Sequence, residues 1–529
     1  MSNTSQTFDF VIVGSGINSL VCAARLAIAG HKVAVIERND RLGGCIRTDE
    51  LTLPGFKHDT LSGFHPLFVS SPTYSELNNE LSNAGLKYCN TPYPTGVILD
   101  DGRSLVLETN RQANIERFNS VAAGDGDAYA RALASVEKDA ELTFSLLGGA
   151  VWSFPTLKVL GKTFVSRGIG GLTDYFGSAI GNCRTWLEGD FNSELVRALF
   201  APWVLHAGLG PDASMSGLMG RVMAFSLEQL GMPIVQGGSS HFVAAFEAII
   251  TSHGGEIFKG THIDEIEVAN NVAQSAVASS GLRYIGRKGI ICNVAPTQLY
   301  LHLLRNASLD SGIIEQIRNY RYGRGDMQIH LALKEPLAWP DPILQKVAML
   351  HITPGLDGVS RAVNEADCGM LPGTATIVAA QPTALDPMRA PNGKHILWIQ
   401  LQELPRKIKG DAAGEITIGS DGVWTPNIRD AYVQRILQRL EKLAPNLRNA
   451  LLDVKALSPT DIEKLNINLV GGDPYCGVCS LDQFMLWRPY KGVRNHRTPI
   501  KNLTHIGAST HPGPGLGGGS GFLASESLK

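Results

Sequence analysis

Three small residues at fixed spacing near the N-terminus, Gly14, Gly16 and Ser19, could hold a phosphate group against bare backbone. They follow the apolar, β-branched run 8–13, and an alanine-rich helical pattern begins directly after them. Gly14 permits a tight turn out of the predicted strand, and Gly16 lets a dinucleotide pyrophosphate approach the positive end of the helix. The third position is usually glycine, so Ser19 weakens this fingerprint without breaking it.

An acidic residue follows at the distance that a dinucleotide site requires. The predicted helix ends at Gly30, residues 32–37 form a predicted second strand, and Glu37 lies 23 positions after Gly14. An acid at this place accepts hydrogen bonds from the ribose hydroxyls of a dinucleotide. The alternative is an ordinary strand-helix-strand unit that binds no nucleotide.

A second pair of glycines, Gly43 and Gly44, follows this acid closely. It would bring another stretch of backbone towards the diphosphate, and this arrangement favours FAD over NAD. Arg38, Arg41 and Arg47 could add positive charge there. The alternative is a simple loop with two turn glycines.

The titratable residues nearest to this region are His58, Asp59 and His65, in a loop rich in glycine and proline. Histidine titrates near neutral pH, so these side chains could line the cofactor or act as acid and base. The alternative, which the sequence leaves open, is that both histidines only hydrogen-bond the loop backbone.

Composition excludes several classes of protein. The chain has 529 residues, a net charge of −2 and 44% hydrophobic residues, which together indicate a globular protein of more than one domain. This charge disfavours nucleic-acid binding. Eight scattered cysteines do not resemble a disulfide framework. The longest notable uncharged stretch, 142–157, is shorter than the about 20 residues of a membrane-spanning helix. We therefore expect a cytoplasmic protein.

Changes of pattern along the chain suggest two interleaved domains. Residues 1–90, 231–300 and 465–529 are predicted to form a nucleotide-binding domain, and residues 91–230 and 301–464 a substrate-binding domain. The second domain begins with a hairpin at 97–107, and we interpret Arg324-Gly325-Asp326 as a turn. Its first segment contains many aromatic residues, which could line an apolar pocket, lie against a membrane or simply form core: Phe144, Trp152, Phe154, Phe164, Tyr175 and Phe176.

Two motifs lie near the C-terminus. Cys476 and Cys479 have the spacing of a redox or metal pair, but no second pair accompanies them, so a turn with two unpaired thiols is the preferred interpretation. After a predicted strand at 503–506, the segment 507–521 is so rich in glycine that close approach of its backbone to a ligand explains it best. A flexible tail is the alternative.

These residues resemble the carotenoid-desaturase-like flavoproteins, and within them the phytoene dehydrogenase-related branch (the pyridine nucleotide-disulfide oxidoreductase domain-containing protein 2-like group). The matching motifs occur in family order along nearly the whole chain. They are 14–20 with Asn18, Gly43-Gly44, Pro54-Gly55-Phe56 with His58-Asp59, Gly237-Gly238, 254–257, Asn293 with Pro296, 480–483 and 510–513.

The resemblance implies an α/β fold of the glutathione-reductase and amine-oxidase class. A Rossmann-type FAD domain is assembled from discontinuous segments, with an inserted mixed α+β substrate domain. Glu37 would then hold the adenosine ribose, residues 41–44 would follow the diphosphate, and Val268 would lie near the adenine. The segment 507–517, with Gly507, Gly515, Leu516 and Gly517, would approach the pyrophosphate and the flavin.

We therefore hypothesise an FAD-dependent dehydrogenase or desaturase that oxidises an apolar (terpenoid, alicyclic or polyene-like) substrate by hydride transfer to flavin N5. The candidate proton acceptors are His58, Asp59, His65 and His511. A redox-neutral isomerase, an amine-type oxidase and a non-catalytic flavoprotein are the alternatives. The electron acceptor (oxygen, quinone or protein), a covalent FAD link, a peripheral membrane contact and a homo-oligomer stay open, and no metal is expected.

Overall fold

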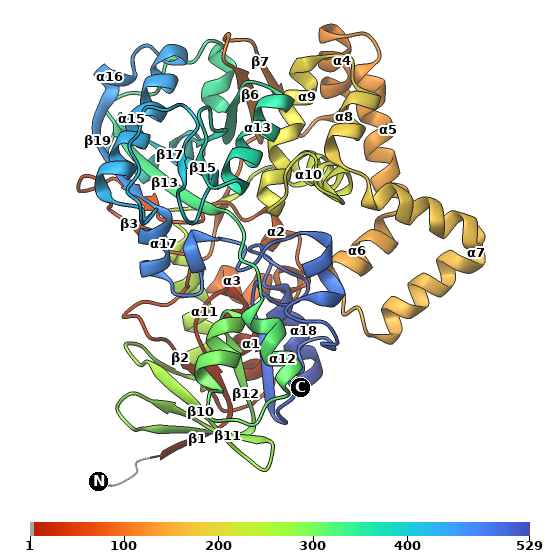
Figure 1. Cartoon of the computed structure of the whole chain (residues 1–529), viewed down its shortest axis with the longest axis vertical. Coiled ribbons are helices and arrows are strands. Elements are labelled where there is room, and N and C mark those ends of the chain that lie inside the picture. Colours follow the sequence, from red (N-terminus) through yellow and green to blue (C-terminus); the bar gives the residue numbers. More distant parts are fainter. Residues whose placement is uncertain (1–4) are drawn as a thin grey trace.

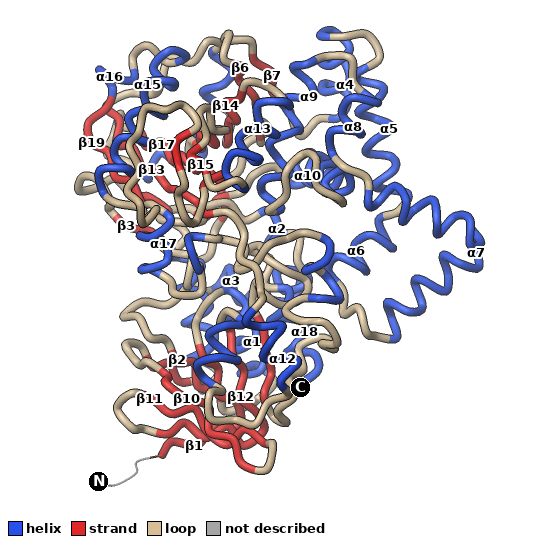
Figure 2. The backbone as a smooth tube through the Cα atoms, viewed as in Figure 1, coloured by secondary structure: helices blue, strands red, loops and turns tan. Residues whose placement is uncertain are grey.

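The structure, a computed structural model, describes residues 5–529 of the chain. Its elements gather around two large sheets, which lie at opposite ends of the molecule in Figures 1 and 2. Both ends of the chain lie at the lower end in these views, beside the first sheet. Across residues 5–529, every helix is too short or too polar to traverse a lipid bilayer.

The first sheet is built around β1, which pairs in parallel with β2 on one side and β12 on the other. The strand order is β10-β11-β12-β1-β2-β9, and β20 pairs with the last part of β12. Its strands are β1 (Ser5–Val13), β2 (Val33–Ile36), β9 (Glu256–Phe258), β10 (Ile263–Ala269), β11 (Val272–Ala278), β12 (Arg283–Asn293) and β20 (Leu503–Ile506).

The apolar residues of β1 bury both faces of this sheet, as expected for a parallel strand. Phe10 and Ile12 pack into one core with α1 (Ile17–Ile28), α11 (Ser240–Ser252) and α18 (Gly519–Leu528). Val11 and Val13 pack into a second core on the opposite face. Because both faces are covered, the ends of the strands are where this sheet can present a ligand site.

The second sheet has the strand order β19-β13-β17-β16-β14-β6-β7. One of its faces packs against α15 (Pro426–Leu443) through alternate residues such as Ile329 and Ile399. The other face carries the polar members of the same alternation, Gln328 and Gln400, which are paired across β13 and β17. The strands are β6 (Thr95–Leu99), β7 (Ser104–Leu107), β13 (Gly325–Leu333), β14 (Met349–Thr353), β16 (Ile377–Ala380), β17 (His395–Leu404) and β19 (Leu451–Leu457).

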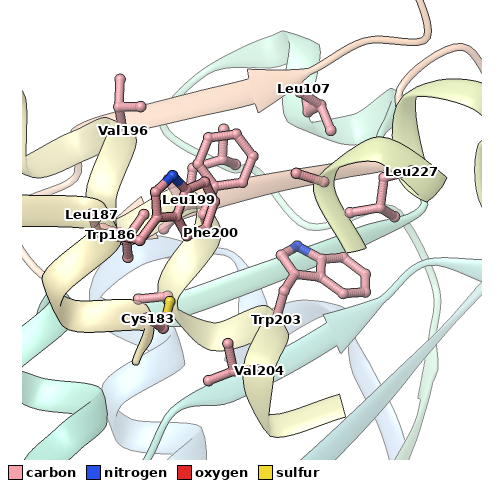
Figure 3. Close-up of a cluster of buried hydrophobic side chains, with 14 of the residues drawn as sticks. Leu107, Cys183, Trp186, Leu187, Val196, Leu199, Phe200, Trp203, Val204 and Leu227 are labelled. Atoms are coloured by element: carbon pink, nitrogen blue, oxygen red, sulfur yellow. The ribbon is translucent and has the colours of Figure 1, made fainter. Parts of the chain in front are cut away.

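A group of helices continues from the second sheet, towards the right in Figure 1. Figure 3 shows the apolar cluster that holds it, in which Phe200, Trp203 and Leu227 lie among aliphatic side chains. The helices are α4 (Arg111–Val121), α5 (Asp125–Lys138), α6 (Ala140–Gly148), α7 (Phe154–Ile180), α8 (Cys183–Asp190), α9 (Glu194–Phe200) and α10 (Ser216–Leu230), and a 3₁₀ segment (Ala201–Ala207) joins the last two.

Shorter elements complete the fold between and around the two sheets. The small strands are β3 (Thr48–Asp49), β4 (His58–Asp59), β5 (Tyr88–Cys89), β8 (Ile234–Val235), β15 (Met370–Leu371) and β18 (Gly410–Asp411). The remaining helices are α2 (Pro66–Val69), α3 (Pro72–Asn83), α12 (Ser311–Arg318), α13 (Leu356–Asp367), α14 (Pro382–Leu385), α16 (Leu447–Ala450) and α17 (Pro459–Leu465).

Most predicted elements agree with the structure, with one correction that concerns the site. The predicted hairpin is β6–β7, which pair antiparallel. Arg324-Gly325-Asp326 is not a turn, because β13 begins at Gly325 and Asp326 is a buried strand residue. The first sheet draws its strands from 5–36, 256–293 and 503–506, while the exact domain boundaries stay a prediction.

Candidate active site

A single cavity of about 390 Å³ extends from the ends of β1 and β2 to the polar face of the second sheet. Its wall includes Gly14 and Glu37 from the first sheet and Asp326 and Gln400 from the second. The segments 466–469 and 507–509 also line it. The cavity therefore joins the predicted nucleotide site to a second chamber.

At the nucleotide end, Ser15 links the glycine turn to Glu37. The carboxylate of Glu37 accepts hydrogen bonds from the backbone N–H of Ser15 at 3.0 Å and from its hydroxyl at 2.6 Å. The N–H of Gly43 donates to the Ser15 hydroxyl oxygen at 3.1 Å. This network fixes the turn, the acid and the second glycine pair together. The sequence analysis missed Ser15, the variable residue inside the glycine motif.

The backbone at this end is bare in the way that a diphosphate requires. Gly16 is the residue before α1 and supplies no side-chain cap, so the first N–H groups of the helix are left for a ligand. A β-carbon at Gly44 would lie 3.2 Å from the Cα of Gly16, and one at Gly14 would lie 2.9 Å from the carbonyl oxygen of Asn293. Only glycine permits this close approach of three backbone segments.

Most of the predicted cofactor-binding residues line the cavity. They are Gly14, Gly16, Glu37, Arg38, Gly43, Gly44, Gly507, Gly515 and Leu516. The structure places the other four elsewhere among the described residues. Arg41 is exposed and forms an ion pair with Asp49, and Gly517 follows the lining segment.

Val268 and Ser19 are the other two residues outside the cavity wall. Val268 lies near the far end of β10, and Ile263 at the beginning of this strand lines the cavity instead. Ser19 is buried, and its hydroxyl oxygen accepts a hydrogen bond from the Asn293 side-chain N–H at 2.9 Å. The serine at the third position of the fingerprint thus ties α1 to the end of β12.

The second chamber combines aromatic side chains with one polar patch. Phe64 and Trp398 stack with ring centroids 6.0 Å apart, and Trp203 and Met349 also line the wall. The polar patch comes from the alternation along β13 and β17, together with two residues from other segments. It consists of His206, Asp326, Gln328, Gln400, Gln402 and Tyr475.

Asp326 is the one carboxylic acid of this chamber within residues 5–529. One carboxyl oxygen accepts hydrogen bonds from the side-chain N–H groups of Gln328 at 2.6 Å and Gln400 at 2.8 Å. The other oxygen has no partner within the described part of the chain. Burial raises the pKa of Asp326 to about 8, although the two hydrogen bonds act in the opposite direction. An acid of this kind can exchange a proton near neutral pH.

The four predicted proton acceptors lie elsewhere, because other contacts hold them. Asp59 accepts hydrogen bonds from Arg389 at 2.8 Å and from the N–H of Ser239 at 2.9 Å, so it joins three segments of the fold. The ring of His58 contacts the hydroxyl of Thr52 at 2.8 Å.

The other two candidates are similarly engaged. The ring of His65 contacts the hydroxyl of Tyr88 at 3.2 Å, and that of His511 donates to the carbonyl oxygen of Gly149 at 2.7 Å. Burial lowers the pKa of His58, His65 and His511 to about 4, so each ring is neutral at pH 7. None of the four is among the described residues that line the cavity, so the geometry gives them no contact with a substrate there.

The cysteine pair forms no redox or metal centre in residues 5–529. Cys476 and Cys479 are buried, unpaired thiols, and burial raises the pKa of both. Cys476 contributes to the cavity wall. The described residues contain no group of three potential ligands that could hold a metal ion.

The family model of the flavin containing amine oxidoreductases matches residues 20–461. The chain belongs to this family. Its cofactor is therefore FAD, and it is an FAD-dependent oxidoreductase by family.

Relatives of this flavin-containing amine oxidoreductase match over nearly their whole length. The rat pyridine nucleotide-disulfide oxidoreductase domain-containing protein 2 is 26% identical over 98% of this chain and 93% of its own length. One of the limonene dehydrogenase polypeptides of Castellaniella defragrans is 22% identical over 100% and 95%. A 4,4'-diapophytoene desaturase of a Methylomonas species is 22% identical over 98% and 93%.

A solved structure also supports the fold. The oxidoreductase from Methanosarcina mazei superposes with a TM-score of 0.64 and 16% identity, over 99% of this chain and 100% of its own. The α/β fold predicted from the resemblance is confirmed, as is the resemblance to the desaturase-like flavoproteins.

The residues at the nucleotide end fit FAD. The uncapped end of α1 and the close backbone of Gly14, Gly16 and Gly44 suit the diphosphate, and Glu37 suits the ribose. The rest of the cavity reaches the second sheet, where the flavin end of the dinucleotide belongs. In this family the bound FAD supplies the two-electron chemistry.

The contact between Ser19 and Asn293 gives a first testable prediction. We expect Ser19→Ala and Asn293→Ala each to lower the free energy of unfolding by about 0.5–1.5 kcal/mol, because each removes the same hydrogen bond between α1 and β12. The double variant should lose less than the sum of the two. Chemical denaturation of the four proteins measures this coupling, and strict additivity would show that the contact contributes nothing.

Proposed function

We propose that this enzyme is a dehydrogenase or desaturase of an apolar substrate. The observation that carries the proposal is the cavity itself, which leads from the FAD-binding turn to a chamber walled by Phe64, Trp203 and Trp398. Such a chamber favours a substrate with a large apolar surface. The names of two relatives, a limonene dehydrogenase polypeptide and a diapophytoene desaturase, agree with terpenoid or polyene substrates.

We propose that the substrate loses a hydride from one carbon and a proton from the neighbouring carbon, which leaves a double bond. FAD supplies the acceptor of the hydride, at flavin N5. Asp326 would take the proton as its carboxylate, since it is the acid of the chamber. Gln328 and Gln400 would hold the carboxylate in place through the two hydrogen bonds that they donate. The aromatic wall would exclude water.

Anaerobic reduction of the bound flavin tests this proposal. Purified protein with FAD is mixed with candidate terpenoids or polyenes without oxygen, and the flavin absorbance is followed. We expect one of these substrates to bleach the flavin and to gain one double bond. Bleaching by amines alone would favour an amine-type oxidase. Product formation without net flavin reduction would favour an isomerase, and a flavin that no small molecule reduces would favour a non-catalytic protein.

A further inference from the structure

A helical hairpin made of α6 and α7 projects from the body of the molecule, at the right of Figure 1. The two halves of α7 meet at Gly168, whose φ of 66° bends the helix. A small core of Leu142, Leu146 and Tyr175 holds α6 against α7, and α7 also contacts α10. The inner side of the hairpin is therefore packed, while its outer side faces away from the body.

The outer side of this hairpin is apolar. Nine of the sixteen large apolar side chains that are exposed in residues 5–529 lie between positions 144 and 180, and Phe154 and Val165 are 79% and 84% exposed. A monomeric soluble protein rarely gathers so many on one feature. The nine are Phe144, Trp152, Phe154, Leu157, Phe164, Val165, Ile169, Phe176 and Ile180.

These residues form a stripe along the first half of α7. Phe154, Leu157, Phe164 and Val165 recur at helical spacing, with the small residue Gly161 between them. Buried threonines occupy the opposite side of the same helix. An exposed stripe of this kind, on a helix too short or too polar to cross a bilayer, is typical of a helix that lies in the membrane interface.

A basic border lies beside the stripe. Asn495 and Trp152 are joined by two hydrogen bonds of 3.3 Å, so the segment 487–497 lies against the base of the hairpin. This segment exposes Trp487 and the cations Lys491, Arg494 and Arg497. The sequence has no acidic residue between positions 482 and 526 to neutralise them.

The acids near the hairpin leave these cations free. Glu141 pairs with Lys162, and Asp139 pairs with Arg167. Asp174 is the only acid of α7 itself. The surface thus combines exposed aromatic and aliphatic side chains with a net positive border, and this charge is complementary to anionic lipid headgroups.

We infer that the α6–α7 hairpin docks this protein on the surface of a bilayer that contains anionic lipids. The apolar stripe would enter the boundary between headgroups and acyl chains, and the basic border would contact the headgroups. A second copy of the chain fits less well, because a symmetric pair would bring the same cations together. The hairpin also reaches the cavity wall, since His511 binds Gly149 at its base and belongs to the loop that lines the cavity nearby.

Vesicle binding tests the inference. The full chain with FAD is sedimented with vesicles of phosphatidylcholine alone and of phosphatidylcholine mixed with phosphatidylglycerol. We expect binding to the mixed vesicles, weaker binding to the neutral ones, and a decrease of binding at high salt. We expect Phe164→Asp and Val165→Asp each to weaken binding by about tenfold or more. Arg494→Glu should remove the preference for the mixed vesicles.

Val423→Asp is the matched control, because Val423 is 48% exposed and lies outside the hairpin. It should bind vesicles like the unchanged protein, and all variants should keep their FAD and melting temperature. Failure of the unchanged protein to bind mixed vesicles overturns the inference. Equal binding by Val165→Asp and Val423→Asp does so as well. A concentration-dependent dimer that Val165→Asp dissociates would assign the surface to a second copy instead.

Discussion

Replacing Asp326 by asparagine will reduce turnover by about 10²–10⁴-fold, the range that removal of a general base produces. The substitution keeps the shape of the side chain and its contacts with Gln328 and Gln400, but it removes the group that takes the proton. The protein should therefore still fold and keep its FAD. Steady-state turnover with the substrate found by flavin bleaching, together with the flavin spectrum of the variant, measures both properties.

The pH dependence of the unchanged enzyme follows from the same carboxyl group. A base must be ionised to accept a proton, and burial raises the pKa of Asp326 to about 8. Turnover should therefore rise with pH and level off above about 8. If Asp326 instead donates a proton, as an isomerase would require, the rate should fall over the same range. The Asp326→Asn variant should lose this pH dependence in either case.

Glu403 provides a matched control on the neighbouring strand. It is a buried acid whose pKa burial raises to about 7, but it binds the N–H of Thr376 and is outside the cavity wall among the described residues. Glu403→Gln should keep turnover and its pH profile. If Asp326→Asn retains full turnover while Glu403→Gln does not, the proton acceptor has been assigned to the wrong acid.

The nucleotide end could be predicted from the sequence because its chemistry depends on local order. A strand, a glycine turn, a helix and an acid follow one another between positions 8 and 37, and few other structures use this order. Contacts across the chain were not visible in the same way. Ser19 departs from the fingerprint, and only the structure shows that its hydroxyl contacts Asn293, more than 270 positions later.

The substrate end was harder because its residues carry no motif. Asp326 follows Arg324 and Gly325, and the sequence analysis interpreted these three residues as a turn. A signal was present in the strict alternation of polar and apolar residues from Asp326 to His330 and from Trp398 to Gln402. Such alternation is typical of a strand with one face in a core and one face elsewhere. It marks the face of the sheet that turns to the cavity.

The histidines illustrate the opposite error. His58, Asp59 and His65 are close in sequence and near the nucleotide motif, which suggested acid and base chemistry. In the structure the same proximity serves packing, since Asp59 joins Arg389 and the beginning of α11, and the histidines are buried and neutral. A cluster of titratable residues indicates a catalytic site only when it also borders a cavity.

Gly16→Val will nearly abolish FAD binding while leaving the fold intact. Gly16 has a φ of −62°, which any residue adopts, and an added β-carbon would meet nothing closer than the Asn293 side-chain nitrogen at 3.2 Å. The protein can therefore accommodate the larger side chain. The diphosphate cannot, because it must approach the backbone at this position. We expect bound FAD to fall below about a tenth of the unchanged level, a loss of at least about 1.4 kcal/mol.

The measurement is the amount of flavin released from each purified protein on denaturation, with far-ultraviolet circular dichroism as the test of folding. Gly189→Val is the control, since Gly189 lies in α8 with no atom within 4 Å of an added β-carbon and should keep its FAD. The two variants add the same side chain, so they separate steric exclusion of FAD from a general effect of valine. A folded Gly16→Val protein with full FAD would place the diphosphate elsewhere in the cavity. Because the hydride must reach flavin N5 beside Asp326, that result would also move the reaction away from the second sheet.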